Sequence, residues 1–231
     1  MHLEQQESLS EQIAKHICEQ IITGELVEGE RIQELRFAKE LDVSRGSVRE
    51  ALLLLERTHL IYIYPRRGAI VAEMSAQQVR ALFDTSTMVL GYFVQRMSET
   101  WRSHEAESLQ QLFHHLNEFV KQGQTEKFYD AIFQHLAAQQ AMVSNPYLMK
   151  FYKELLPSIR RSYFLTLNTS RRELQESLDL FKLVIDAILI RKSQQATLFM
   201  EDFCRHLRNL VLESLTRMKQ IELAWARRSR R

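Results

Sequence analysis

The sequence predicts a mainly α-helical protein in two parts: three short helices with a β-hairpin, then an antiparallel bundle of longer helices. Two features of the composition support this division. Five of the six glycines lie before residue 100, whereas eleven of the twelve phenylalanines lie after residue 80. Because glycine disfavours helix interiors, the later part suits long helices packed around apolar side chains. With 231 residues, 45% of them hydrophobic, the chain can bury a full core.

The first helix is predicted to start after Ser8 and to end near Gly24. Ser8 and Glu11 have the spacing of a capping box, in which each side chain bonds the backbone N–H of the other. A stripe at every fourth position makes the inner face: Ile13, Ile17 and Ile21. We expect this helix to buttress the one that begins after Ser44.

That later helix follows a shorter one, predicted over residues 32–41, after a tight turn. Ser44 is a suitable N-cap. Spacings of three and four residues define an inward face: Val48, Ala51, Leu52 and Leu55. The opposite face carries Arg45 and Arg49, so two guanidiniums project side by side from the first turns. This pattern is typical of a helix-turn-helix, whose second helix enters the major groove of DNA.

The neighbouring residues support this interpretation. Gly46 and Ser47 are small and allow the helix to approach DNA closely, where arginine can bind guanine edges or phosphates. Arg36 and Lys39 lie on the outer side of the preceding helix and can face the phosphate backbone.

A β-hairpin is expected next. Residues 60–64 and 69–72 are strand-like runs, joined by a turn that places Arg66 and Arg67 at its tip and ends at Gly68. A helix-turn-helix followed by a basic hairpin is a winged helix. We place the end of this domain near residue 74, giving domains of 1–74 and 75–231.

Several motifs of this part resemble the N-terminal domain of GntR-type bacterial transcription regulators. The motifs are Gly29-Glu30-Arg31-Ile32, Val43-Ser44-Arg45, Val48-Arg49-Glu50-Ala51-Leu52 and Arg67-Gly68-Ala69-Ile70-Val71. The resemblance covers about the first third of the chain and implies a homodimer that binds a short inverted repeat in double-stranded DNA. Gly46 stands where threonine is common, and Leu35 where some members carry arginine, so the preferred operator is expected to differ.

Pattern and resemblance together predict a set of DNA-contacting residues: Arg36, Lys39, Ser44, Arg45, Gly46, Ser47, Arg49, Arg66, Arg67 and Gly68. The formal net charge of the chain is only +2. Residues 1–74 contain nine Lys/Arg and thirteen Asp/Glu, so their formal charge is −4. A DNA-binding domain with this balance must concentrate its cations on one surface.

The remainder is predicted to form six helices with a period of 3.6 residues, at about 76–102, 105–122, 125–143, 146–168, 171–191 and 194–226. Ser75 and Gln78 have the spacing of a second capping box. An antiparallel bundle after a GntR-type winged helix resembles the FadR subgroup, also called the FCD type, whose C-terminal domain binds an effector and dimerises. Asp130-x-x-Phe133, Asn145-Pro146 and His206-Leu207 add to this resemblance.

Many members of that subgroup hold a metal ion with one aspartate and three histidines. Here Asp130 and His206 match, but Gln134 and Phe181 occupy the other two positions. A neutral amide and an apolar ring are poor substitutes for imidazole. We therefore predict no metal and no other cofactor. A core histidine hydrogen-bonded to Asp130 or Gln134 is favoured over a metal-dependent sensor of a small carboxylate, which stays the alternative.

The candidate ligand-binding residues are mostly apolar: Ser86, Phe93, Asp130, Gln134, Arg160, Phe164, Phe181, Phe203 and His206. Ser86 and Leu90 stand where arginine and glutamate are common in the subgroup. Such a lining suits a fatty acid or acyl thioester, with Arg160 or His206 near its polar head. The alternative is that these side chains fill the interior as a solid core.

The sequence therefore predicts a ligand-responsive, dimeric DNA-binding transcription regulator. It contains no recognisable catalytic site: no nucleophile with a partnered base, phosphate-binding glycine loop or carboxylate pair. An enzyme fused to a DNA-binding module, and a DNA-binding protein whose bundle only dimerises, are the alternatives. With no secretion signal or membrane span expected, we predict a cytoplasmic protein, and Cys18 and Cys204 are expected to be reduced.

Overall fold

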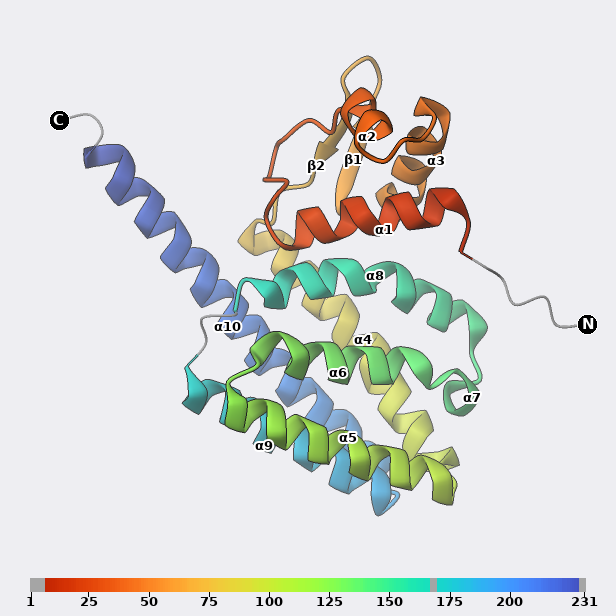
Figure 1. Cartoon of the computed structure of the whole chain (residues 1–231). Helices are drawn as coiled ribbons and strands as arrows, with labels where there is room; N and C mark the ends of the chain where they lie inside the picture. The colour runs from red at the N-terminus through yellow and green to blue at the C-terminus, as the bar shows by residue number, and fades with distance from the viewer. Residues whose placement is uncertain (1–6, 167–169, 229–231) are drawn as a thin grey trace, which may run out of the picture. The chain divides into compact units, whose positions relative to one another are not determined.

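The structure is a computed structural model that describes residues 7–166 and 170–228 (Figure 1). It confirms the mainly helical fold, with one two-stranded sheet after the first three helices. The chain divides into two compact units. Unit 1 contains the residues up to Met74 together with Glu154–Arg161, and unit 2 contains Ser75–Lys153 with the residues from Ser162 onwards.

Unit 1 begins with three helices: α1 (Leu9–Ile22), α2 (Glu34–Glu40) and α3 (Arg45–Glu56). The predicted capping box at Ser8 and Glu11 is confirmed, with both reciprocal bonds present. The isoleucine stripe of α1 is buried against the inner face of α3, where Val48 and Ala51 are fully enclosed. Burying these apolar side chains is the main force that holds α3 in place, and its opposite face is left to solvent.

The predicted hairpin is also confirmed. Strands β1 (Ile61–Tyr64) and β2 (Gly68–Val71) pair antiparallel, with Ile61 opposite Val71 and Tyr64 opposite Gly68. A feature not predicted is that the segment before α2 lies along the other side of β2. The N–H of Val71 donates to the carbonyl of Glu30 at 2.9 Å, and that of Ile32 to the carbonyl of Ala69 at 2.9 Å. This pairing fixes the start of α2 to the base of the hairpin.

The middle of α8 (Pro146–Phe164) belongs to unit 1, although the helix starts and ends in unit 2. Its side chains bond the rest of unit 1 through the pairs Glu154–Arg57, Ser158–Thr58 carbonyl, Arg160–Glu19 and Arg161–Ala72 carbonyl. Arg161 is only 7% exposed and also bonds Glu28 at 3.2 Å. Burial lowers the pKa of Arg161, and the Glu28 carboxylate opposes that effect.

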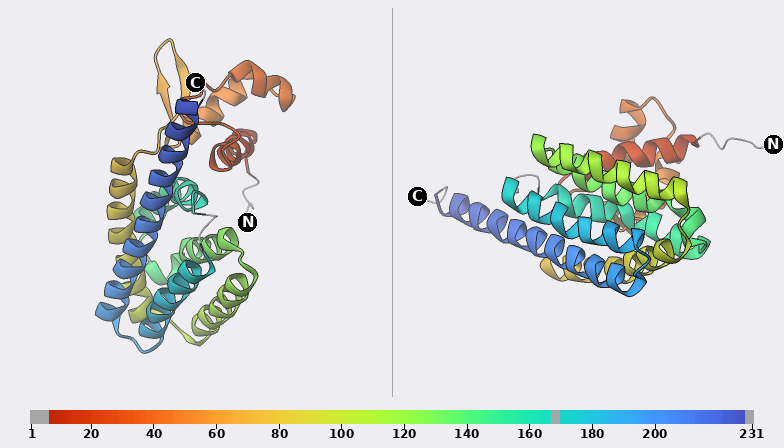
Figure 2. Two further views of the ribbon diagram at one scale, coloured as in Figure 1. Left: turned by 90° about the vertical axis from the view of Figure 1, so that its left-hand side faces the viewer. Right: turned by 90° about the horizontal axis from the view of Figure 1, so that it is seen from below.

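Unit 2 consists of helices α4 (Ala76–Thr100), α5 (Ser103–Gln122), α6 (Thr125–Ala138), α7 (Gln140–Val143), α9 (Arg171–Leu189) and α10 (Ser193–Arg228), with both ends of α8. The capping box at Ser75 and Gln78 that starts α4 is confirmed. Helix α10 packs against α4 and α9 (Figure 2). At one point the α4 backbone comes so close that a Cβ on Gly91 would lie 3.3 Å from Cγ2 of Thr197 in α10.

The prediction of one helix over residues 125–143 is wrong, because the chain breaks at Gln139 into α6 and α7. The backbone N–H of Gln139 bonds the carbonyl of Leu136, three residues back. The side-chain amide of Gln139 donates a hydrogen bond to the carbonyl of His135 at 3.1 Å. In a continuing α-helix, the backbone N–H of Gln139 would bond that carbonyl. The helix predicted over 146–168 ends at Phe164, and residues 167–168 of that range lie outside the described residues.

Aromatic rings make up much of the core of unit 2. The rings of Phe133 and Tyr163 are stacked at 5.5 Å between centroids with an angle of 7°. Phe203 lies 6.5 Å from Phe133 and 5.2 Å from Phe181, so α6, α8, α9 and α10 meet through one aromatic cluster. Within the described ranges, no helix is long and apolar enough to cross a lipid bilayer.

Candidate nucleic-acid interface

Helix α3 starts at a well-formed cap. The Ser44 hydroxyl accepts the backbone N–H of Ser47 at 3.0 Å, and the hydroxyls of the two serines lie 2.9 Å apart. The tight turn before the cap places Asp42 at a φ of +53°, a left-handed conformation that aspartate adopts more readily than most residues. Capping and the buried inner face orient α3 so that Arg45 and Arg49 project outward, with side chains 61% and 64% exposed.

Glu34 on α2, which is not among the sequence-predicted site residues, binds both of these arginines. Arg49 binds Glu34 in a bidentate manner: Nη2 donates to Oε2 at 2.8 Å and Nε to Oε1 at 3.3 Å. Nη2 of Arg45 lies 3.5 Å from the same Oε2. The hydrogen bond from Arg49, followed by the charges of both arginines, holds the pKa of Glu34 below its ordinary value. The carboxylate is therefore ionised at neutral pH.

These groups line a surface depression of about 480 Å³, formed by Arg31, Ile32, Gln33, Glu34, Leu35, Arg45, Arg49 and Gly68. Arg31 is a third arginine that the sequence analysis did not select. Its backbone is bridged to Ile70, and a Cβ on Gly68 would lie 3.5 Å from its Nε. Since that position follows from pairing with β2 and not from a helical pattern, no local signal in the sequence reveals it.

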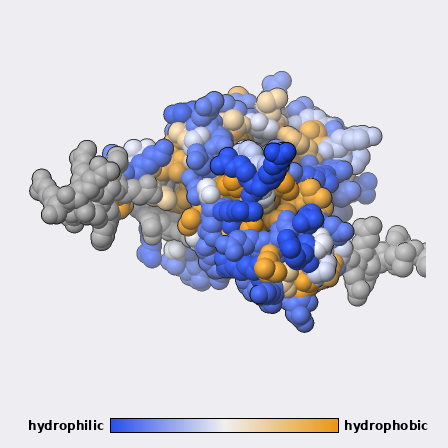
Figure 3. Space-filling model, turned by 90° about the horizontal axis from the view of Figure 1, so that it is seen from above, coloured by the Kyte–Doolittle hydropathy of each residue, from blue (hydrophilic) through white to orange (hydrophobic). Residues whose placement is uncertain are grey.

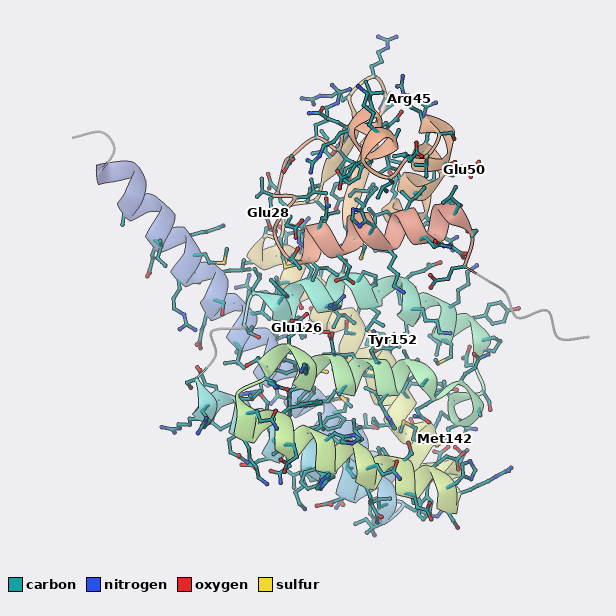
Figure 4. All side chains as sticks on the ribbon, in the orientation of Figure 1. Glu28, Arg45, Glu50, Glu126, Met142 and Tyr152 are labelled. Carbon is teal, nitrogen blue, oxygen red and sulfur yellow. The ribbon has the colours of Figure 1, made fainter. Side chains whose placement is uncertain are left out.

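The other predicted cations occupy the exposed surface of unit 1. Arg66 and Arg67 are exposed in the loop between β1 and β2, and Arg66 has a φ of +62°. On α2, Lys39 is exposed, while Arg36 lies 3.5 Å from Glu40 and over the ring of Phe37. The loop lies at the same end of the unit as Arg45 (Figure 4). Seen from above, the molecule is mostly hydrophilic, with small hydrophobic areas (Figure 3).

In unit 2, the side chains at the four expected metal-ligand positions do not fit a metal centre. Asp130 accepts a hydrogen bond from the hydroxyl of Tyr163, and Nε2 of His206 lies 3.0 Å from Oγ of Ser177. Gln134 is exposed and Phe181 is buried. Among the residues whose positions are described, no three His, Cys, Asp or Glu side chains form a group that could hold a metal ion. An exposed amide and a buried phenyl ring supply no replacement ligands.

The remaining ligand candidates lie among packed side chains. Ser86 is buried and donates to the carbonyl of Leu82 at 2.7 Å, and Phe93 packs edge-on against Tyr152 at 5.2 Å. Phe181 and Phe203 belong to the aromatic cluster described above, and Phe164 is half-buried. Nη1 of Arg160 binds the carboxylate of Glu19 on α1 in unit 1. This contact differs from the sequence-based expectation that the guanidinium of Arg160 lies near a ligand inside the bundle.

Comparison with known protein families decides the identity of the two parts. Residues 9–71 match the family of bacterial regulatory proteins called gntR, and residues 81–209 match the FCD domain. The chain belongs to the GntR family. It is a transcription regulator with an FCD effector-binding domain, and transcription regulators are not a class of enzyme.

Curated relatives of this GntR-family regulator are distant. The gluconate operon transcriptional repressor of Bacillus licheniformis is 21% identical over 176 residues, which cover 75% of this chain and 70% of that protein. The HTH-type transcriptional regulator YdhC of Bacillus subtilis strain 168 is 33% identical over 72 residues, which cover 31% of this chain and 32% of that protein.

Solved structures share the fold. McbR/YncC of Escherichia coli superposes with a TM-score of 0.77 at 19% identity, covering 91% of this chain and all of that one. Lar of Listeria monocytogenes gives a TM-score of 0.62 at 18% identity, covering 91% of this chain and 99% of that one. At these identities the likeness concerns the fold alone.

Proposed function

We propose that this regulator acts in the cytoplasm as a homodimer on a short inverted repeat in double-stranded DNA, and that a small-molecule effector in the FCD domain controls its binding. The observation that carries the DNA-binding part is the pair of exposed arginines on the first two turns of α3, a helix held by its cap and its buried face. Two copies related by a twofold axis would present two such helices to two half-sites.

The proposed DNA contacts divide into two kinds. Arg45 and Arg49 read base edges in the major groove, where a bidentate arginine recognises guanine. The others contact phosphate or the minor groove, or permit close approach: Arg36, Lys39, Ser44, Gly46, Ser47, Arg66, Arg67 and Gly68. Phosphate contacts set the register and the salt dependence of binding, whereas base contacts set the sequence preference.

For the effector we propose a long apolar molecule, a fatty acid or an acyl thioester. The support is the chemistry of the candidate interior, in which buried phenyl rings such as Phe93, Phe181 and Phe203 stand where a hydrophilic ligand would need polar partners. Polar groups in the same region, such as the Ser177–His206 pair, would orient a head group. The poor fit of the metal-ligand positions argues against a metal-bound small carboxylate.

A second candidate is that the bundle only dimerises. The observation in its favour is the close packing of Phe133, Tyr163, Phe181 and Phe203, whose rings already contact one another. An apolar ligand would have to displace part of this cluster, at the cost of its packing contacts.

One experiment separates these candidates. A duplex is first selected by the protein from a random-sequence pool, and its affinity and the protein's melting temperature are then measured with long-chain acyl compounds and with small sugar acids. The acyl compounds should raise the melting temperature and change the affinity, because a ligand that prefers one state shifts the equilibrium toward it. A response to sugar acids alone contradicts the acyl proposal, and no response to either class supports a bundle that only dimerises.

A further inference from the structure

We propose that Glu34 is a specificity residue of the DNA interface: it buttresses Arg49 and Arg45 for base readout and lowers their attraction for DNA phosphates. This inference rests on the proposed function of α3. It adds an acidic side chain to a surface that would otherwise be described by its cations alone.

The geometry of the ion pair supports a buttressing role. Glu34 occupies the Nε–Nη2 edge of the Arg49 guanidinium, with contacts of 3.3 and 2.8 Å. A guanidinium has five N–H donors in a planar fork, so the edge formed by Nη1 and Nη2 keeps donors for a guanine. A bidentate pair restricts the rotation of the arginine head. Less conformational entropy is then lost when the base is bound.

The charge balance supports the second role. Three arginines and one glutamate line the depression: Arg31, Arg45, Arg49 and Glu34. Because Glu34 is ionised, it cancels part of the attraction between these arginines and any DNA backbone. A phosphate that replaced the carboxylate on Arg49 would exchange one charge-assisted hydrogen bond for another, and it would leave Glu34 beside a negative strand with the longer contact to Arg45 in place of its bidentate pair.

Base readout does not pay this penalty, since a guanine edge is neutral and uses the outer edge of the guanidinium. Glu34 therefore weakens binding to all DNA through its charge but weakens binding to the operator less, because there it also orients the arginines. The predicted consequence is a larger ratio of operator affinity to affinity for unrelated DNA.

The test compares the wild-type protein with Glu34→Gln, which keeps the size of the side chain and removes its charge. Two probes are used: a duplex selected by the wild-type protein from a random pool, and a mixed-sequence duplex of the same length. We expect Glu34→Gln to bind the mixed-sequence duplex about three- to tenfold more tightly, with the slope of log affinity against log salt steeper by about 0.9, the value for one additional phosphate contact. Affinity for the selected duplex should rise less or fall, so the ratio decreases.

Glu40→Gln is the matched control. Glu40 is an exposed carboxylate on the same helix and lies 3.5 Å from Arg36 and from His16. This substitution makes the same change in net charge without freeing Arg45 or Arg49. We expect both affinities to shift together, which leaves their ratio at the wild-type value.

The outcomes distinguish the two proposals. If the wild-type protein selects no duplex and binds all DNA equally, the proposed function fails. If it does select a duplex but Glu34→Gln keeps the wild-type ratio, or changes it no more than Glu40→Gln does, the role of Glu34 is contradicted. Should Glu34→Gln not fold, as judged by its thermal transition, Glu34→Asp is measured instead. Its shorter side chain keeps the charge but loses the bidentate reach, and base preference should then relax while the salt slope stays unchanged.

Discussion

At the scale of single residues, the interface depends on how each guanidinium is held. Arg49 is bound by two contacts to Glu34 and Arg45 by one longer contact, although both side chains are more than half exposed. A restrained side chain binds a base in a fixed geometry and loses less conformational entropy in doing so than a free side chain does. Arg49 is therefore expected to contribute more to sequence preference than Arg45.

Replacing either arginine with alanine should weaken binding to the selected duplex without unfolding the protein. If the side chain binds guanine in a bidentate manner, the loss of binding free energy is about 1–3 kcal/mol. The loss should depend on the base pair at the position that the arginine contacts. Titration of each variant against the selected duplex and its single-base variants measures this. Arg172→Ala, an exposed arginine on α9 that lies 3.1 Å from Glu176, is the control. Wild-type affinity in either Arg45→Ala or Arg49→Ala would contradict the assignment of α3.

A second prediction at this scale concerns His135. Burial lowers the pKa of its imidazole below the ordinary value. In the unfolded chain the imidazole takes up a proton at about pH 6.5, while in the folded protein it stays neutral to lower pH. The neutral, buried imidazole therefore contributes its full stability above the pKa of the unfolded chain. This contribution is lost as the pH falls from the unfolded-chain pKa towards the lower pKa of the folded protein.

The measurement is denaturant unfolding of the wild-type protein and His135→Gln at about pH 7.5 and 5.5, on either side of the ordinary pKa. Glutamine cannot take up the proton, so the variant should lose less stability between the two pH values than the wild-type protein does. His104→Gln is the control, because that side chain is 73% exposed. Equal losses in the wild-type protein and His135→Gln would contradict the prediction.

At the scale of elements, local patterns decide where most helices start, and side-chain hydrogen bonds decide where some of them end. Serine caps start α1, α3, α4 and α9. The break between α6 and α7 instead depends on the Gln139 side chain bonding the carbonyl of His135. The hairpin gains a third aligned segment, residues 29–32, which brings Arg31 beside the wing.

The wing provides a prediction at this scale. Neutralising Arg66 and Arg67 together should flatten the salt dependence of DNA binding, because each phosphate contact contributes about 0.9 to the slope of log affinity against log salt. Specificity should change less than affinity, since phosphate contacts carry no sequence information. Affinities for the selected and mixed-sequence duplexes across a salt series measure both effects. An unchanged slope would show that the wing does not face DNA.

At the scale of the whole molecule, helix α8 contributes residues to both compact units, its middle to unit 1 and its two ends to unit 2. Ion pairs and hydrogen bonds from Glu154, Ser158, Arg160 and Arg161 tie its middle to α1, to the end of α3 and to the segment after β2. Arg160 thus forms an ion pair with Glu19 within unit 1, so its positive charge is balanced without an effector. Its proposed role in ligand binding would require that contact to be shared or broken.

The protein should purify without stoichiometric metal, and a chelator such as EDTA should change neither its melting temperature nor its affinity for the selected duplex. The reason is that Gln134 and Phe181 supply no imidazole, while Asp130 and His206 already have hydrogen-bond partners. Elemental analysis of freshly purified protein, with thermal unfolding before and after chelation, measures this. Tight stoichiometric zinc, nickel or manganese would overturn it.

The sequence by itself determined the fold class, the serine caps, the hairpin and the exposed arginines of α3. These features depend on residues within about four positions of one another, so periodicity and capping rules predict them. The tertiary structure alone decided which distant groups meet: Glu34 with arginines 11 and 15 positions away, Arg31 with the base of the wing, and Arg160 with Glu19, 141 positions away. Such partners depend on which surfaces the folded chain brings together, and this cannot be predicted from a local sequence pattern.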